Sequence, residues 1–251
     1  MTTPIDTPIH EVVREHYGGL ARSAGSCCGP SDCGCNTLYP ADLTVGLPGE
    51  VAEFSLGCGD PITLAGLQPG DVVVDLGSGG GLDCFLAAKK VGKAGRVIGV
   101  DMTPDMLVKA RANAARLGAT NVEFRQGHIE ALPVADGEAT VVISNCVINL
   151  SPDKPQVFRE IFRALRPGGR VAVSDIVTEG PMSSLVAQGL EAWSECVAGA
   201  LPVADYEAGL RAAGFVDVQA TPKDDTAAPG MKRAVPAAGM PFSALITARK
   251  P

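Results

Sequence analysis

The stretch VVVDLGSGGG at residues 72–81 constrains the fold of this chain more than any other segment. An apolar run that ends in an acid and a glycine is typical of a strand buried on both faces of a parallel sheet. Glycines after such a strand let the backbone turn sharply into a helix and let a ligand approach the main chain closely. We therefore predict an α/β protein with a ligand-binding turn at residues 77–81.

Strand-like and helix-like patterns alternate along most of the chain. Helices are predicted over 82–92, from a cap at Thr103 to Leu117, and within 153–169. Apolar, β-rich segments before, between and after them predict strands at 70–77, 96–101, 121–127, 139–145 and 169–176. Strands that alternate with helices imply a doubly wound, mostly parallel sheet.

The remaining segments frame this sheet, and we divide the chain into three parts of one fold. Residues 1–60 are expected to form a short helix that ends at Gly18 and Gly19, followed by an irregular, cysteine-rich arm. Residues 61–180 form the ligand-binding core. Residues 181–251 supply helices at 183–201 and 206–215 and two closing strands at 215–221 and 242–250, which are separated by a long loop at 222–241.

Charge and cysteine content narrow the class of protein. A net charge of −7 and no visible basic stripe argue against nucleic acid or an anionic membrane as a partner. We find no long apolar span and no leader, so we expect a cytoplasmic protein. In a reducing compartment, eight cysteines indicate metal binding, catalysis or redox chemistry rather than structural disulfides.

The glycine-rich turn departs from the dinucleotide pattern G-x-G-x-x-G, because Leu82 occupies its third glycine position. Asp101 ends the next predicted strand, 22 residues after Gly79. At that place its carboxylate can accept hydrogen bonds from both hydroxyls of a ribose. The pattern therefore indicates a nucleoside ligand of another kind.

DLGSGGG followed by VIGVDMT resembles the motifs of the class I S-adenosylmethionine-dependent methyltransferases. The resemblance implies a Rossmann-like, seven-stranded sheet with one antiparallel strand, and S-adenosyl-L-methionine as cofactor. It also implies contacts to the methionine part, the ribose and the adenine. The implied cofactor residues are Asp75, Gly77, Ser78, Gly79, Asp101, Met102, Ile129, Glu130 and Asn145.

The sequence indicates the methyl acceptor less directly than it indicates the cofactor. A general base is the usual companion of an oxygen or nitrogen acceptor, but we expect structural or solvated roles for His10, His16 and His128. Cys146 follows the predicted strand 139–145, where ligands of open α/β sheets bind, and Cys58 and Cys196 can approach it. Three thiolates suit a soft acceptor with a lone pair, such as arsenic(III), which needs no base.

The segments SLGCGDP, SNCVINL and ECVAGAL together resemble the arsenite S-adenosylmethionine methyltransferases. By this resemblance Cys58, Cys146 and Cys196 bind trivalent arsenic, whose lone pair attacks the sulfonium methyl group. Arsenite or its thiol conjugates are the implied substrates. We expect no metal beyond this arsenic.

Four further cysteines crowd the arm at 27–35, in the spacing CC-x4-C-x-C. This spacing lacks the paired C-x2-C of structural zinc sites. The family also carries a thiol in its arm, so we interpret Cys27 or Cys28 as an accessory redox thiol that captures arsenite or forms a transient disulfide with Cys58. Thioredoxin or glutathione would then restore the thiols.

Two other functions remain open at this point. The chain could be a class I methyltransferase that acts on a carbon or oxygen of a small molecule, its cysteines being incidental. It could also be a thiol-rich protein that binds arsenic or a metal without transferring methyl groups. Cys84, inside the predicted helix 82–92, is interpreted as a small core residue.

Overall fold

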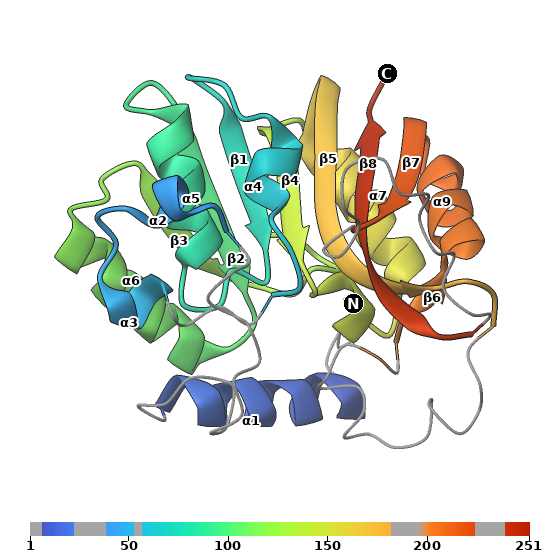
Figure 1. Cartoon of the computed structure of the whole chain (residues 1–251), viewed down its shortest axis with the longest axis horizontal. Helices are drawn as coiled ribbons and strands as arrows, with labels where there is room; N and C mark the ends of the chain where they lie inside the picture. Colours follow the sequence, from blue (N-terminus) through green and yellow to red (C-terminus); the bar gives the residue numbers. More distant parts are fainter. Residues whose placement is uncertain (1–6, 23–38, 53–56, 182–196, 198, 224–238) are drawn as a thin grey trace.

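The computed structural model describes residues 7–22, 39–52, 57–181, 197, 199–223 and 239–251. A mixed β-sheet forms the centre, and helices cover both of its faces (Figure 1). The element order is that of an α/β protein in which strands and helices alternate up to the last two long strands. The predicted fold class is confirmed.

The sheet has the strand order β3-β2-β1-β4-β5-β8-β7, and a two-residue strand, β6, pairs with β5 outside this path. Strands β1 to β5 run parallel to their neighbours, whereas β8 is antiparallel to both β5 and β7. The sheet thus has eight strands, one more than expected, because β6 is added. The strand bounds are β1 Val72–Leu76, β2 Arg96–Asp101, β3 Val122–Gln126, β4 Ala139–Asn145, β5 Leu165–Thr178, β6 Leu201–Pro202, β7 Val216–Pro222 and β8 Pro241–Arg249.

Four helices follow the strands much as predicted. They are α5 (Leu82–Val91), α6 (Pro104–Leu117), α7 (Lys154–Ala164) and α9 (Val203–Ala212). Asp153 caps α7 by accepting from the backbone N–H of Gln156. The segment 165–169, at the end of the range 153–169 within which a helix is predicted, instead begins β5.

Small aliphatic side chains fill the core on both faces of the sheet, as the low aromatic content requires. On one face Ile62, Leu86 and Leu107 pack in one buried cluster. On the other face Phe158 and Tyr206 belong to a second cluster. Burial on both faces explains why the central strands read as continuous apolar runs.

The segment before the sheet is more ordered than we predicted. Helix α1 spans Pro8–Arg22 and passes through the glycines at which we expected it to end. Three short helices follow, namely α2 (Ala41–Thr44), α3 (Gly49–Ala52) and α4 (Pro61–Ala65). Tyr39, Leu43 and Val51 are buried in the core, so residues 39–52 belong to the domain rather than to an irregular arm.

Several predicted features lie outside the described residues. They are the cysteines of the arm, Cys196, most of the helix expected at 183–201 and most of the loop at 222–241. Within the parts that are described, no helix combines the length and the apolar character needed to cross a bilayer.

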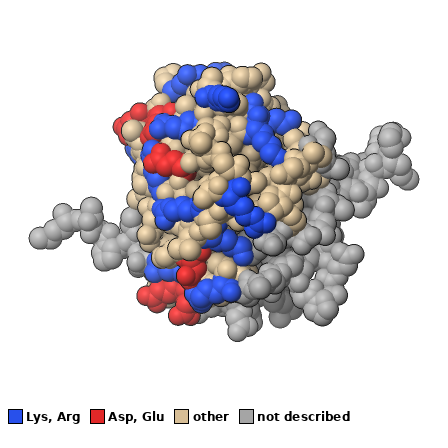
Figure 2. Space-filling model, turned by 90° about the vertical axis from the view of Figure 1, so that its left-hand side faces the viewer, with Lys and Arg blue, Asp and Glu red and all other residues tan. Residues whose placement is uncertain are grey.

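The acidic net charge is unevenly distributed over the surface. Figure 2 shows a face on which lysine and arginine gather with fewer acids among them. On α5 and α6, Lys89, Lys90, Arg111 and Arg116 are exposed. We had expected no basic patch, and this face differs from that expectation because the whole-chain charge averages over all faces.

Candidate functional site

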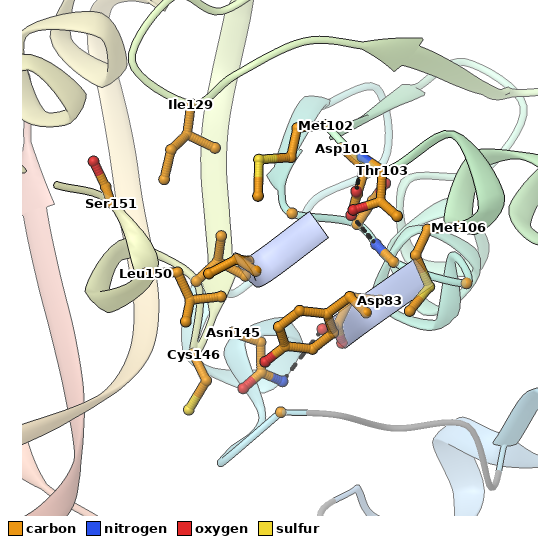
Figure 3. A pocket seen from close by; sticks show the side chains of 18 of the residues that line it. Asp83, Asp101, Met102, Thr103, Met106, Ile129, Asn145, Cys146, Leu150 and Ser151 are labelled. Carbon is orange, nitrogen blue, oxygen red and sulfur yellow. Dashed lines mark hydrogen bonds between the residues drawn. The ribbon is translucent and has the colours of Figure 1, made fainter. Parts of the chain in front are cut away.

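A pocket opens between α1 and the carboxyl ends of the central parallel strands (Figure 3). Its wall combines the glycine-rich turn, the ends of β2 and β4, and side chains of α1. Eight of the nine predicted cofactor residues lie on this wall, although their contact with a cofactor stays a prediction. These eight are Gly77, Ser78, Gly79, Asp101, Met102, Ile129, Glu130 and Asn145.

The turn at 77–81 requires glycine for steric reasons. Gly77 has a φ of 65°, and a Cβ on it would lie 2.5 Å from the side chain of Val147. The neighbouring Ser78 is buried, and its hydroxyl has no hydrogen-bond partner among the described residues. A buried hydroxyl on a pocket wall is a group that a bound ligand can satisfy.

Asp101 ends β2 with both carboxylate oxygens held by backbone N–H groups. Oδ2 accepts from Gly79 at 2.9 Å, and Oδ1 accepts from Thr103 at 2.8 Å. Burial raises the pKa of Asp101, and these backbone hydrogen bonds act in the opposite direction. The carboxylate is thereby oriented at the pocket, and each oxygen keeps acceptor capacity for a hydroxyl.

Asp75 is the predicted cofactor residue that the pocket wall does not include. It is 2% exposed within β1, and Cys84 Sγ donates to its Oδ2 at 3.2 Å. Burial, followed by the charge of Asp83, raises the pKa of Asp75 well above its usual value. Cys84 is a buried core residue as predicted, but it also satisfies this acid.

Glu130 is held by two side chains that sequence reasoning did not connect to it. His10 of α1 contacts it through Nε2 at 3.1 Å, and the Ser151 hydroxyl donates to the same carboxylate oxygen. Nδ1 of His10 accepts from the backbone N–H of Thr7 at 3.2 Å, so Nε2 carries the proton that His10 donates. Burial opposes ionisation of Glu130, but hydrogen bonds from His10 and then Ser151 leave its pKa lowered.

The same corner offers the one group of possible metal ligands within the described residues. His10, His128 and Glu130 present ligand atoms that lie within 4.8 Å of one another. His10 and Glu130 are already hydrogen-bonded to each other. The sequence predicts a structural or solvated role for His10 and gives no sign that its side chain lies on the pocket wall beside Glu130, 120 residues later in the chain.

A second acid, Asp83, was also missed. It lies in the first turn of α5 and lines the pocket, where Tyr39 donates to its Oδ1 at 2.5 Å. Burial raises the pKa of Asp83 to about 6, while hydrogen bonds from Tyr39 and Asn145 oppose the shift. An acid in a first helical turn is common, so its sequence context carried no signal for this role.

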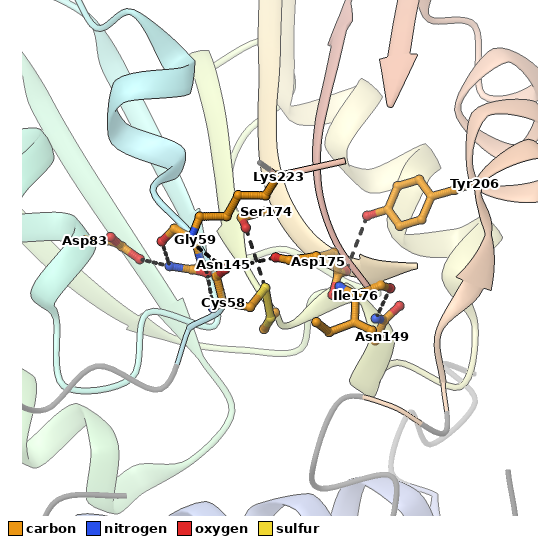
Figure 4. Close-up of a disulfide and its surroundings, with 12 residues drawn as sticks. Cys58, Gly59, Asp83, Asn145, Asn149, Ser174, Asp175, Ile176, Tyr206 and Lys223 are labelled. Atoms are coloured by element: carbon orange, nitrogen blue, oxygen red, sulfur yellow. Dashed lines mark hydrogen bonds between the residues drawn. A yellow bond between two sulfur atoms is a disulfide. The ribbon is translucent and has the colours of Figure 1, made fainter. Parts of the chain in front are cut away.

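Cys58 and Cys146 lie beside the pocket and are joined by a disulfide with a Cα–Cα distance of 6.0 Å (Figure 4). We expected free thiols, and for this pair that expectation is wrong. The prediction that the two sulfurs converge from distant segments, 88 residues apart, agrees with this geometry. Cys196, Cys27 and Cys28 fall outside the described residues, so their predicted roles stay predictions.

Cys146 itself has an unusual backbone. Its φ of 59° lies in the left-handed region, although it is not a glycine. Its N–H donates to the carbonyl of Ser174 at 2.8 Å, and this bond holds the peptide at the end of β4. Sparsely populated backbone conformations gather at functional sites. The site thus combines a pocket lined by acids and by the glycine-rich turn with two sulfur atoms at its edge. Such a site can hold a cationic ligand next to a thiophilic one.

Comparison with known proteins gives a consistent picture. Residues 67–226 match the family model of a methyltransferase domain. The chain is 48% identical over 233 residues to an arsenite methyltransferase of Halobacterium salinarum, a match that covers 86% of the chain and 59% of that protein. It is 39% identical to an arsenite methyltransferase of Aquipseudomonas alcaligenes, with 83% and 62% covered. The chain therefore spans about 60% of the length of these curated relatives.

Solved structures agree with the sequence matches. An arsenic(III) S-adenosylmethionine methyltransferase from Chlamydomonas reinhardtii superimposes with a TM-score of 0.68 at 37% identity, covering 84% of this chain and 73% of that one. A SAM-dependent methyltransferase from Aquifex aeolicus, at 19% identity and a TM-score of 0.58, shares the fold.

Proposed function

The chain belongs to the arsenic(III) S-adenosylmethionine methyltransferases, within the methyltransferase-domain family, and from this premise we propose that it methylates trivalent arsenic. The observation that carries the proposal is the position of Cys58 and Cys146, whose sulfurs meet beside the acidic pocket. A soft acceptor bound to sulfur would then lie next to the methyl donor.

The pocket fits S-adenosyl-L-methionine in its chemistry. Ser78 offers a buried hydroxyl without a partner in the described structure, Asp101 offers oriented acceptors for ribose hydroxyls, and Asp83 offers a carboxylate for a cationic group. Met102 and Ile129 supply apolar wall beside Glu130 for the adenine. When bound, the cofactor supplies an electrophilic methyl group, to which the arsenic lone pair can donate. No side chain then has to remove a proton from the acceptor.

The cysteines hold the substrate in this proposal. Cys58, Cys146 and Cys196 would each exchange a thiol proton for a bond to arsenic, so that arsenite loses its three hydroxyl groups as water. The disulfide must first be reduced, because a sulfur bonded to sulfur cannot also bind arsenic as a thiolate. Two electrons and two protons from a dithiol such as thioredoxin, or from two molecules of glutathione, accomplish this step. We place the reaction in the cytoplasm, where such reductants are abundant.

Redox cycling extends the same chemistry to the arm. Methyl transfer leaves arsenic formally pentavalent, and its return to the trivalent state needs two electrons. Two thiols can supply them by forming a disulfide, and Cys27 or Cys28 with Cys58 is the pair we propose. The described pair Cys58–Cys146 supports the view that Cys58 readily takes part in disulfides.

The test is a methylation assay with S-adenosyl-L-methionine, arsenite and a dithiol reductant, in which arsenic species are separated by chromatography and detected by elemental mass spectrometry. We expect methylated arsenicals from the parent protein and at least a hundredfold less from Cys146→Ser, because the serine hydroxyl is a poor ligand for a soft centre. Cys84→Ser is the matched control, since Cys84 is buried away from the pocket wall.

Two results would contradict the proposal. If Cys146→Ser methylated arsenic as fast as the parent protein, the proposed cysteine site would be wrong. Unchanged arsenite, in a sample that demonstrably binds both ligands, would favour a methyltransferase acting on a small-molecule carbon or oxygen. A protein that binds arsenic but not the cofactor would favour the thiol-based binding protein instead.

A further inference from the structure

The Asn145 side chain forms hydrogen bonds at both ends of its amide. Its Oδ1 accepts from the backbone N–H groups of Cys58 at 2.9 Å and Gly59 at 3.2 Å. Its Nδ2 donates to the Gly59 carbonyl at 2.9 Å, to the Tyr39 hydroxyl at 3.0 Å and to the Asp83 carboxylate at 3.3 Å. One side chain at the end of β4 therefore binds the segment that carries Cys58 (Figure 4).

The chemistry of the partners determines which end of the amide points in each direction. Two N–H donors face Oδ1, while a carbonyl, a carboxylate and the Tyr39 oxygen face Nδ2. The Tyr39 hydroxyl donates its hydrogen bond to Asp83 at 2.5 Å, so its oxygen acts as the acceptor for Asn145. Tyr39 and Asp83 thus fix the orientation of the amide, and only a carboxamide satisfies both sets of partners.

The backbone fits around this amide with little room to spare. A Cβ on Gly57 would overlap the Asn145 amide, so the chain before Cys58 can approach only because residue 57 is a glycine. From the other side, the Ser243 hydroxyl donates to the Cys58 carbonyl at 2.9 Å. Asn145 thus binds both N–H groups and the Gly59 carbonyl of this segment, whereas Ser243, with Lys223 at 3.5 Å, binds the Cys58 carbonyl.

We propose that Asn145 is a positioning residue that places the Cys58 sulfur against the Cys146 sulfur. Asn145 directly precedes Cys146, so one short piece of backbone carries both the residue that holds the Cys58 segment and the second sulfur. The two sulfurs converge because the amide ties a segment 87 residues away to the end of β4. The role in arsenic binding rests on the function proposed above, whereas the convergence of the two thiols does not.

Disulfide formation measures this positioning without arsenic or cofactor. The fully reduced protein is treated with diamide, which takes two electrons and two protons from two thiols and is itself reduced to the hydrazine. Samples are quenched with an alkylating reagent over time, and mass spectrometry of peptides identifies which cysteines have paired. The observed rate of Cys58–Cys146 pairing reports how often the two sulfurs meet.

We expect Asn145→Ala to pair Cys58 with Cys146 roughly ten- to a hundredfold more slowly than the parent, the effect expected of a misplacement of about 1 Å. Asn121→Ala is the matched control. The Asn121 amide donates to the Ala88 and Gly92 carbonyls, far from the pocket, so this variant also loses half-buried hydrogen bonds but should pair at the parental rate. Tyr39→Phe removes only the hydroxyl oxygen that accepts from Asn145, and it should slow pairing severalfold. This variant replaces Asn145→Ala in the test if Asn145→Ala does not fold.

Equal pairing rates in the parent and the Asn145→Ala or Tyr39→Phe variant would overturn the inference, as would a parent protein that pairs Cys58 with another cysteine. If the pairing rates change as expected but the parent does not methylate arsenite, the function proposed above fails and the positioning role stands. If arsenite is methylated but the pairing rate does not depend on Asn145, the proposed function stands and the positioning role fails.

Discussion

At the scale of single residues, the site depends on acids that line one pocket or lie close to it. Asp83 and Asp101 line the wall, and Asp75 is buried within β1, outside the wall. Burial raises the pKa of each of these carboxyl groups. Such acids are costly to ionise in the absence of a counter-charge, and a cationic ligand supplies one. The acids therefore favour a positively charged molecule in the pocket over a neutral one.

This arrangement makes cofactor binding dependent on pH. The pKa of Asp83 is about 6 in the ligand-free protein, so we expect the affinity for S-adenosyl-L-methionine to fall roughly two- to tenfold as pH is lowered from 8 to 5. The same shift makes the ligand-free fold less stable as pH rises from about 4 to 6, because the folded state holds the proton more tightly than the unfolded state.

Calorimetric titration at several pH values measures this effect, and Asp83→Asn should flatten it. Adenosine, which lacks the positive charge, should bind with little pH dependence and serves as the control ligand. An identical pH dependence in the parent and in Asp83→Asn would show that another group is responsible.

Sequence patterns predicted the acids at the ends of strands but not those reached through tertiary contacts. Asp101 could be identified because its place after a strand defines its chemistry. Tyr39, 44 residues before Asp83, and His10, 120 residues before Glu130, become neighbours only after the chain folds. No local spacing reports such pairs, which explains why they were missed.

At the scale of elements, α1 supplies one wall of the pocket at the carboxyl ends of the strands. Ile9, Val13 and Tyr17 pack near Cys146 and Leu150, and His10 reaches Glu130. Arg22 at the other end of the helix pairs with Asp105 of α6, but both side chains are exposed and the pair adds little stability. The hydrogen bond of His10 and the packing of the apolar side chains Ile9, Val13 and Tyr17 therefore hold α1 in place.

We expect His10→Ala to loosen α1. The change leaves the buried Glu130 carboxylate without its hydrogen bond from the imidazole, a loss of about 1.5 to 3 kcal/mol for a bond to a charged group. Hydrogen–deuterium exchange of peptides from residues 8–22 should become at least tenfold faster. His16→Ala, which truncates an exposed histidine on the same helix, is the control. Equal exchange in the two variants would show that His10 does not anchor the helix.

Helices long enough to repeat an apolar pattern were predicted well, and shorter helices were not. Helices α5 and α6 repeat their apolar positions over several turns and end at glycines. In contrast, α2 and α3 have four residues each, which is too short to show a period. In the first residues of β5, LRPGG, Leu165 pairs with Ala139, and the register shifts before the next pair, Arg170 with Val141. The turn residues 166–169 thus lie in an irregularity of the strand, which agrees with their local preference.

At the scale of the whole molecule, the disulfide between Cys58 and Cys146 closes a loop that contains half of the strands of the sheet. The closed loop contains β1 to β4 with helices α5 and α6. Cross-linking residues this far apart restricts the unfolded chain, by about 4 to 5 kcal/mol for a separation of 88 residues in the chain-entropy treatment. The oxidised protein should therefore be the more stable form.

Thermal unfolding with and without a dithiol tests this expectation. We expect the reduced protein to unfold several degrees below the oxidised one. The variant Cys58→Ser should unfold near the reduced temperature in both conditions, because it cannot form this bond. Cys84→Ser, which leaves the pair intact, should keep the difference. A reductant effect of equal size in Cys58→Ser would assign the stabilisation to other cysteines.

The placement of α1 also has a consequence for synthesis of the chain. The helix leaves the ribosome before its partners Glu130 and Ser151, which lie more than a hundred residues later in the chain. At about 5 to 20 residues per second, Glu130 emerges roughly 6 to 24 seconds after His10. During that interval the apolar side chains of α1 lack the surface that they will cover, so this helix can dock only after the later segments have emerged.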